Sequence, residues 1–158
     1  MGKKILCIIM LLFIAFSIDN ISFAQFSDVD NHWARIDISY LTKKGIAGGY
    51  SDGTFRPNRN ITRAEFLKMV NRVFEYKGKI DIAFKDVNEE DWFYEDFRTA
   101  VAMGYINGYD DGTIRPNRPI TREEASKIIV MASILGGELP DMDPSFKDKE
   151  KIGQWAKS

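Results

Sequence analysis

One stretch of 17 residues occurs twice in this chain and constrains its fold more than any other feature. Residues 49–65 read GYSDGTFRPNRNITRAE and residues 108–124 read GYDDGTIRPNRPITREE, so 13 of the 17 positions are identical. The residue types are varied and their order is kept, which excludes low sequence complexity as the cause. Such self-similarity indicates tandem copies of one supersecondary unit that pack against each other.

A shorter motif, Phe-x-Asp followed by a tryptophan, precedes each long copy and occurs a third time. It begins at positions 26, 84 and 146 of the 158-residue chain. The third copy stops before its own Gly-Tyr turn and Thr-Arg helix. We therefore expect repeat one over residues 25–83, repeat two over residues 84–145, and the start of a truncated third repeat over residues 146–158.

Each repeat is expected to form a helix, an irregular loop and a second helix. Apolar residues recur at helical spacing after the Phe-x-Asp motif and again after the Thr-Arg motif. Gly45 and Gly104 are placed to end the first helices in the left-handed conformation. Asp-Gly turn dipeptides follow, and Pro57 and Pro116 disfavour helix between the two helical segments. The fold class is therefore mostly α, with tandem helix–loop–helix repeats.

The second helix of each repeat begins with Thr-Arg-x-Glu, which is the pattern of a capping box. Thr62 with Glu65 and Thr121 with Glu124 are the expected helix-capping pairs. In each pair the threonine hydroxyl accepts a hydrogen bond from the glutamate amide, and the glutamate carboxylate accepts one from the threonine amide.

An arginine stands in the first turn of each second helix, where the helix dipole disfavours positive charge. Arg63 and Arg122 are in register in the two copies, which suggests that the position is used. A helix N-terminus offers free amides to an anion, and a guanidinium adds a planar fork for a carboxylate. The alternative is a salt bridge to an acidic residue of a neighbouring repeat, such as the aspartate of Phe-x-Asp. The residues alone leave both roles open.

Residues 1–24 have the three parts of a secretory signal peptide. Two lysines precede an apolar run, and Ser22 and Ala24 are the small residues before a cut at Gln25. The run is short for a membrane span, so we expect cleavage, export and no stable membrane insertion. Cys7 is the one cysteine and lies within the run, so the exported chain is expected to have no disulfide.

Charge and composition exclude several kinds of partner. The chain has 22 Lys and Arg and 23 Asp and Glu, and the signal peptide contains Lys3, Lys4 and Asp19. The exported part therefore carries 20 basic and 22 acidic side chains, a net charge of −2. That balance gives no global attraction to nucleic acid or to an anionic membrane surface, so neither is expected as a partner.

No group of residues typical of an enzyme is present, and no catalytic residue or cofactor is expected. His32 is the one histidine and is not repeated in the second copy. The Asp-Gly turns resemble pieces of calcium loops, but Thr, Phe or Ile, Arg and Pro follow them and supply few oxygen ligands. A metal site is therefore not expected either.

The motifs Phe-x-Asp-Val…Trp, Lys-Gly-Ile-x-x-Gly-Tyr-x-Asp-Gly-Thr-Phe-Arg-Pro-Asn and Ile-Thr-Arg-Ala-Glu-Phe together resemble the S-layer homology (SLH) domain. The resemblance covers nearly all of the exported chain, in tandem. It implies a part of a pseudo-threefold helical prism that anchors exported proteins non-catalytically to the bacterial cell wall or S-layer. The implied ligand is secondary cell-wall polysaccharide, often carrying pyruvate ketals, in the grooves between repeats.

The resemblance assigns the contact with the acidic sugar to the arginines of the Thr-Arg-x-Glu motifs, Arg63 and Arg122. We then expect Arg63→Ala to weaken wall binding with little loss of stability. For the two tryptophans a core position is the favoured alternative to sugar contact, and for the Gly-Tyr pairs it is turn packing. The further groove candidates that the resemblance implies are Asp28, Trp33, Asp86, Trp92, Gly49, Tyr50, Gly108 and Tyr109.

Departures from the family pattern bear on where the ligand lies. Glu123 stands where repeat one has Ala64 and places a carboxylate beside Arg122, so the groove between repeats one and two, with Arg63, is the expected main site. A truncated third repeat would leave the prism unable to close. Two related roles stay open: contact with peptidoglycan or its attached glycan in an outer-membrane protein, and anchoring of a larger enzyme whose catalytic domain is absent here.

Overall fold

The computed structural model describes residues 26–135 and residue 151. The signal peptide predicted for residues 1–24, the linker 136–145 and the third-repeat segment apart from residue 151 lie outside the described residues. The described part contains four helices and no strand; one isolated antiparallel bridge joins Thr62 and Pro119. The helices are α2 (Arg35–Lys43), α3 (Arg63–Phe74), α4 (Tyr94–Ala102) and α5 (Arg122–Ile134).

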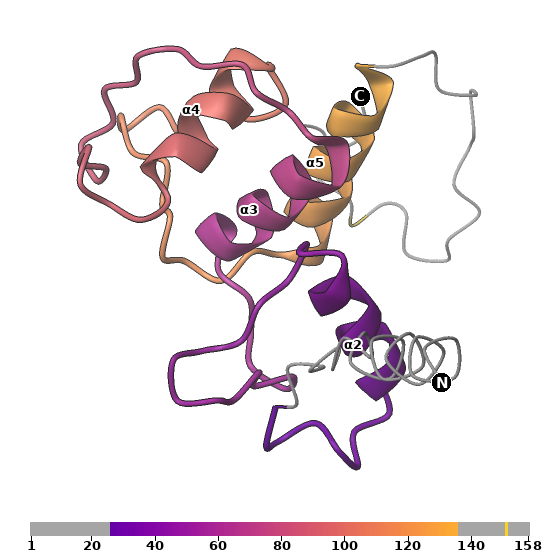
Figure 1. The fold of residues 1–158 in the computed structure, drawn as a ribbon. Helices are drawn as coiled ribbons and strands as arrows, with labels where there is room; N and C mark the ends of the chain where they lie inside the picture. Colours follow the sequence, from indigo (N-terminus) through magenta and orange to yellow (C-terminus); the bar gives the residue numbers. More distant parts are fainter. Residues whose placement is uncertain (1–25, 136–150, 152–158) are drawn as a thin grey trace, which may run out of the picture.

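The four helices are not arranged as two separate pairs. Helices α2 and α3 belong to repeat one, and α4 and α5 belong to repeat two, but α3 packs against α4 and α5. Among the described helices no other pair is in contact, and α2 lies apart from the other three (Figure 1). The second helix of repeat one is therefore the central element of a core that belongs mostly to repeat two.

The hydrophobic core confirms this arrangement. Leu67 on α3, Phe97 on α4 and Ile114 in the loop of repeat two are the largest side chains that are fully buried. Ala64 and Val70 lie on the same buried face of α3, together with the polar Arg63 and Asn71. Leu67 and Val70 follow the helical spacing expected from the sequence, but Val73, which continues that spacing, is 51% exposed.

The expected helix ends are confirmed in both copies. Thr62 Oγ1 accepts from the Glu65 amide at 3.2 Å, and Glu65 Oε2 accepts from the Thr62 amide at 2.9 Å. Thr121 and Glu124 form the same two bonds at 3.2 and 3.0 Å. The glycines after α2 and α4 adopt positive φ, 69° at Gly45 and 77° at Gly104, the conformation in which glycine stops a helix without steric cost.

The expectation that the two tryptophans lie in the core is wrong. Trp33 is 87% exposed and Trp92 is 55% exposed. Trp33 precedes the first turn of α2, and α2 has no described helix beside it to cover its apolar residues. Ile36 and Tyr40, which share the helical spacing of Trp33, are also exposed, and the buried residue of α2 is Ile38.

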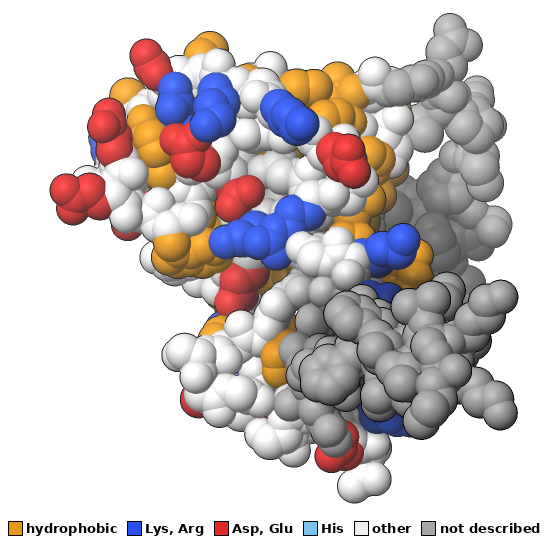
Figure 2. All heavy atoms as spheres, in the orientation of Figure 1, with side chains coloured by type: hydrophobic (Ala, Val, Ile, Leu, Met, Phe, Trp, Pro, Cys, Tyr) orange, Lys and Arg blue, Asp and Glu red, His pale blue; other side chains and the backbone are white. Residues whose placement is uncertain are grey.

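The surface carries charges of both signs. Figure 2 shows lysine and arginine side chains interspersed with acidic ones over the upper part of one face, without a large field of a single sign. None of the helices in the described ranges has both the length and the hydropathy needed to cross a bilayer.

Candidate functional site

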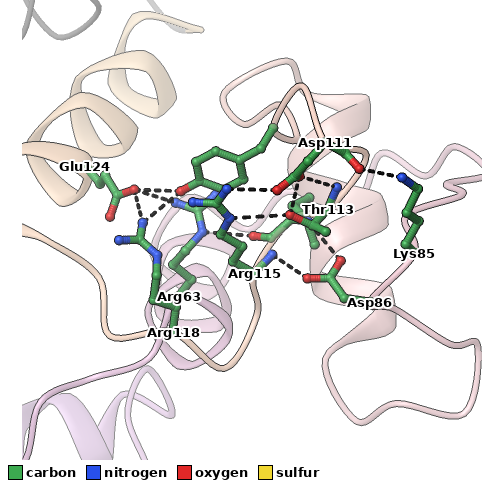
Figure 3. A network of polar contacts seen from close by, with 10 residues as sticks. Arg63, Lys85, Asp86, Asp111, Thr113, Arg115, Arg118 and Glu124 are labelled. Atoms are coloured by element: carbon green, nitrogen blue, oxygen red, sulfur yellow. Dashed lines mark hydrogen bonds and ion pairs between the residues drawn. The ribbon is translucent and has the colours of Figure 1, made fainter.

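The boundary between the repeats is built around one arginine from repeat one. Arg63 on α3 extends into repeat two, where its Nε donates to the Ile114 carbonyl at 3.0 Å and its Nη1 lies 3.7 Å from Glu124 Oε1 (Figure 3). Its guanidinium lies 5.4 Å from the centroid of the Tyr109 ring. The side chain is only 4% exposed, so Arg63 is part of the contact between repeats.

Two further arginines, both from the loop of repeat two, surround the same tyrosine. The guanidinium of Arg115 lies 3.8 Å from the centroid of the Tyr109 ring, and that of Arg118 lies 5.8 Å from it. Arg118 donates to the Tyr109 hydroxyl at 2.8 Å, and that hydroxyl donates to Glu124 Oε1 at 2.7 Å. Arg118 also forms an ion pair with Glu124. We call Arg63, Tyr109, Arg115, Arg118 and Glu124 the boundary cluster.

The loop that carries these arginines is held by two aspartates. Asp86 accepts from the amides of Ile114 and Arg115 at 2.9 and 2.8 Å. Asp111 accepts from the amide and hydroxyl of Thr113 at 3.0 and 2.6 Å and pairs with Arg115 at 2.9 Å. Arg115 has a φ of 54°, a conformation unusual for a residue with a side chain. The bonds to its amide and guanidinium stabilise it there.

Burial and pairing set the electrostatics of the cluster. Burial raises the pKa of Glu124, but the hydrogen bonds from the Thr121 amide and the Tyr109 hydroxyl and the charges of Arg63 and Arg118 outweigh it and lower that pKa. Burial lowers the pKa of Arg63, and the neighbouring Tyr109 and Glu124 oppose this shift. Hydrogen bonds from Thr113 and Arg115 hold the pKa of Asp111 at about 2. The carboxylates are therefore ionised near neutral pH.

Repeat one contains the same arrangement, with one difference. Tyr50 lies between Arg56 and Arg59, and its hydroxyl donates to Glu65 at 2.8 Å. Asp28 clamps the loop through the amides of Phe55 and Arg56 at 2.8 and 2.7 Å. We call Tyr50, Arg56, Arg59 and Glu65 the repeat-one cluster. Within the described ranges no arginine of another repeat enters it.

Because Arg63 enters the boundary cluster and, among the described residues, no corresponding arginine enters the repeat-one cluster, the two clusters contain different numbers of charged groups. In the boundary cluster three guanidinium groups pair with two carboxylates, those of Glu124 and Asp111. In the repeat-one cluster two guanidinium groups pair with two carboxylates, those of Glu65 and Asp52. The boundary cluster therefore contains one guanidinium group more than the repeat-one cluster, and its Arg115 and Arg118 side chains are 41% and 36% exposed.

The predicted site residues fall into groups with different environments. For Arg63 the sequence left anion binding and an internal ion pair open; the structure places it in an ion pair within the protein, with Glu124 in place of the suggested aspartate. Arg122 is exposed. Asp28 and Asp86 bind loop amides. They are not partners of Arg63, so that suggested pairing is wrong.

Gly49 and Gly108 serve close packing in the turns, as the alternative interpretation predicted. A Cβ at Gly49 would lie 2.1 Å from a ring atom of Phe26, and one at Gly108 would lie 2.3 Å from a ring atom of Phe84. Both glycines therefore let the phenylalanine of Phe-x-Asp pack directly on the turn of its own repeat.

A separate cavity of about 910 Å³ lies in repeat one. We call it the repeat-one cavity. Its walls come from α2, the loop that follows, the outer side of α3, and Trp92 of repeat two. Of the predicted ligand residues, the cavity brings together Trp33, Gly49, Tyr50 and Trp92. Arg63, Arg122, Asp28, Asp86, Gly108 and Tyr109 do not line it.

Sequence reasoning did not find the second role of Glu124, which caps α5 and also binds Tyr109, Arg118 and Arg63. A signal was present: the spacing Tyr-x5-Arg-x2-Arg-x5-Glu is identical in the two copies. A capping glutamate needs no tyrosine or arginine at fixed distances, so the repetition of all four residues indicated a shared network. Among the described residues no group of His, Cys, Asp and Glu could hold a metal ion.

Comparison with known proteins gives a consistent result. The family model of the S-layer homology domain matches residues 25–67 and 83–126. A cellulosome-anchoring protein of Acetivibrio thermocellus is 42% identical over 133 residues, which cover 80% of this chain and 29% of that protein. The surface-layer 125 kDa protein of Lysinibacillus sphaericus is 33% identical over 139 residues, 87% of this chain and 12% of that protein.

Enzymes also contain regions similar to this chain. An amylopullulanase of Thermoanaerobacterium thermosulfurigenes is 32% identical over 137 residues, which cover 84% of this chain and 7% of the enzyme. The chain thus spans less than a third of the length of each of these three relatives.

Proposed function

The chain belongs to the S-layer homology domain family and is a cell-surface anchoring module; from that premise we propose that it binds an acidic secondary cell-wall polysaccharide at the boundary cluster. The observation that carries the proposal is the additional guanidinium of Arg63 at this cluster, beside the guanidinium groups of Arg115 and Arg118 that remain partly exposed. A carboxylate on a sugar, such as that of a ketal-linked pyruvate, fits the two parallel donors of an arginine.

In this proposal the three arginines have different tasks. Arg115 and Arg118 meet the sugar carboxylate, because their side chains are 41% and 36% exposed. Arg63 is a positioning residue that supplies the third positive charge and holds the cluster together from the neighbouring repeat. A direct contact of Arg63 with sugar would require its side chain, which is 4% exposed, to become accessible. A contact of sugar with the exposed Arg122 stays a prediction.

The role in the whole protein is also a proposal. The relatives named above are several times longer than the matched region, so a module of this kind forms a small part of each. We propose that the chain is exported to the cell envelope and attaches itself, or a larger protein that contains it, to the wall. The module itself is non-catalytic.

The test is co-sedimentation of the exported chain with purified cell-wall sacculi, either intact or stripped of polysaccharide by acid. We expect the chain to pellet with intact sacculi only. Equal pelleting with both would assign binding to peptidoglycan, the alternative ligand, and pelleting with neither would refute wall binding.

Matched variants locate the site. Arg115→Gln with Arg118→Gln removes the two exposed cations of the boundary cluster, and Arg56→Gln with Arg59→Gln removes their counterparts in repeat one. Because the two pairs make the same contacts within their own repeats, the structural cost should be similar. We expect the first double variant to lose at least about tenfold more affinity than the second. Equal losses would contradict the assignment to the boundary cluster.

A further inference from the structure

The repeat-one cavity corresponds to a place that is filled in repeat two. From Trp33 and Trp92 onward, residues of the two repeats correspond at a separation of 59 positions, as Tyr50 and Tyr109 do. In repeat two the buried residues that surround α3 include the following: Phe97, Ala100, Tyr105, Ile106 and Ile114. Their counterparts in repeat one all line the cavity: Ile38, Leu41, Ile46, Ala47 and Phe55.

The contact between α3 and repeat two is therefore a template for what the cavity can hold. Asn71 of α3 donates to the carbonyl and carboxylate of Asp96 at 3.0 Å each and accepts from the Tyr105 hydroxyl. The Lys68 ammonium lies 4.9 Å from the centroid of the Trp92 ring. At the helix start, the Arg63 and Ala64 amides donate to the carbonyls of repeat two at 3.0 Å each.

The other helix of this type in the sequence is α5, and its corresponding face is not covered in the same way. Ile129 and Val130 are 47% and 38% exposed, whereas their counterparts on α3, Val70 and Asn71, are 5% and 7% exposed. Arg122, the counterpart of Arg63, is exposed. The chain thus has two surfaces that correspond to the two sides of the contact between α3 and repeat two. One is the exposed face of α5, and the other is the repeat-one cavity.

Compared with α3 and repeat two, α5 and the repeat-one cavity differ at matching positions, which favours a contact between them. In the contact between α3 and repeat two, the Tyr105 hydroxyl of repeat two donates a hydrogen bond to Asn71 of α3, so both residues are polar. The counterparts are Val130 on α5 and Ile46 in the cavity, so that both sides become apolar. One charged pair is matched as well, because Arg122 would face Glu65, the counterpart of Glu124. Glu123, by contrast, stands where α3 has the fully buried Ala64 and weakens the contact.

We propose that the repeat-one cavity receives α5 of a second copy of this chain, in the manner in which repeat two receives α3. The contact is head-to-tail, so each copy uses its cavity for one neighbour and its α5 for another. Ser126 stands where α3 has the fully buried Leu67. The association is therefore weaker than the contact between the repeats and depends on concentration. This inference is independent of glycan binding at the boundary cluster.

Sedimentation velocity of the exported chain tests the proposal. We expect the weight-average mass to rise above that of one chain as concentration increases. Trp33→Ala in the cavity and Val130→Asp on α5 should each weaken the association by about tenfold or more, because Trp is often central to interfaces and a buried charge is costly. The controls are Ile36→Ala and Val73→Asp, which change exposed residues outside the cavity.

Mixing the two variants shows whether weaker association results from a disrupted contact surface or from a misfolded chain. The Val130→Asp chain keeps an intact cavity and the Trp33→Ala chain keeps an intact α5, so a mixture should form a heterodimer although neither variant associates alone. A chain that stays monomeric at every concentration, a mixture that does not associate, or controls that weaken association equally would overturn the proposal. A monomer whose Trp33 fluorescence responds to isolated wall polysaccharide would also overturn it and assign the cavity to glycan.

Discussion

Repeats one and two have nearly the same motifs but different surroundings. The first helix of repeat two, α4, packs against α3, whereas the first helix of repeat one, α2, contacts none of the other described helices. Tyr109 is approached by an arginine from the other repeat, whereas in the described part of the chain Tyr50 is approached by two arginines of its own loop and by none of repeat two. The sequence of a repeat therefore determines its local network, and its neighbours determine which parts of that network are buried.

The comparison also shows that one repeat is not one folding unit. Repeat two obtains the centre of its core from repeat one, through Ala64, Leu67 and Val70 of α3. The hydrogen bonds of the Arg63 and Ala64 amides to the Arg118 and Pro116 carbonyls, at 3.0 Å each, also cross the boundary.

The largest difference in the free energy of unfolding is expected between variants of Phe97 on α4 and of its counterpart Ile38 on α2. Phe97→Ala should destabilise the protein by about 3–5 kcal/mol, because the ring is fully buried between α3 and α4. Ile38→Ala should cost about 2 kcal/mol or less, since α2 has no helix beside it. Urea unfolding measures both free energies; equal costs would show that α2 is as well packed as α4.

Substitution of Arg63 should also cost more stability than substitution of its counterpart Arg122. Arg63→Ala should cost about 1–3 kcal/mol, because it removes the donor to the buried Ile114 carbonyl and one of the two ion pairs of Glu124. Arg122→Ala should change stability by less than about 0.5 kcal/mol, as is usual for an exposed side chain. The burial of Arg63 thus replaces the expectation from sequence that its loss spares stability. Thermal unfolding of both variants decides between the two.

A smaller and more equal effect is expected for the helix caps. Thr62→Ala and Thr121→Ala each remove the acceptor of one capping-box bond and should cost about 1 kcal/mol. Thr62→Ser and Thr121→Ser keep the hydroxyl and serve as controls that should unfold close to the original protein. A cost near zero for either alanine variant would contradict the capping assignment of that helix.

The smallest effect is a difference in titration between the two capping glutamates. The pKa of each lies below its ordinary value of 4.5. The stability they contribute is therefore present above about pH 4.5 and is lost as pH falls through their folded-state pKa values. Because Glu124 faces Arg63 as well as Arg118, we expect its NMR titration midpoint to lie below that of Glu65. Arg63→Ala should remove the difference; if the midpoints coincide before substitution, Arg63 does not act on Glu124.

Local features could be predicted from the sequence because they depend on neighbouring residues. The capping boxes at Thr62 and Thr121 and the left-handed glycines at positions 45 and 104 follow from short-range geometry. The family and the tandem organisation follow from long ordered motifs. These signals require no knowledge of which repeat lies beside which.

The environments of Arg63, Trp33 and Ile38 could not be predicted in the same way. Trp33 and Trp92 occupy corresponding positions and the sequence favoured the core for both, yet both are exposed. Arg63 and Arg122 share one motif, but one is buried and the other is exposed. In each case the outcome depends on which elements pack against each other over long range: α3 packs against repeat two, whereas α2 has no described helix beside it. Helical periodicity does not encode this.

Native-state hydrogen exchange tests most directly whether the repeats share one core. Lys44 and Met103 have corresponding amides, which donate to the Tyr40 and Thr99 carbonyls at 3.0 Å each. We expect the Met103 amide and the boundary amides of Arg63 and Ala64 to exchange only through global unfolding, and the Lys44 amide to exchange faster through local opening of α2. Equal protection of Lys44 and Met103, or boundary amides that exchange before those within α4, would contradict the shared core.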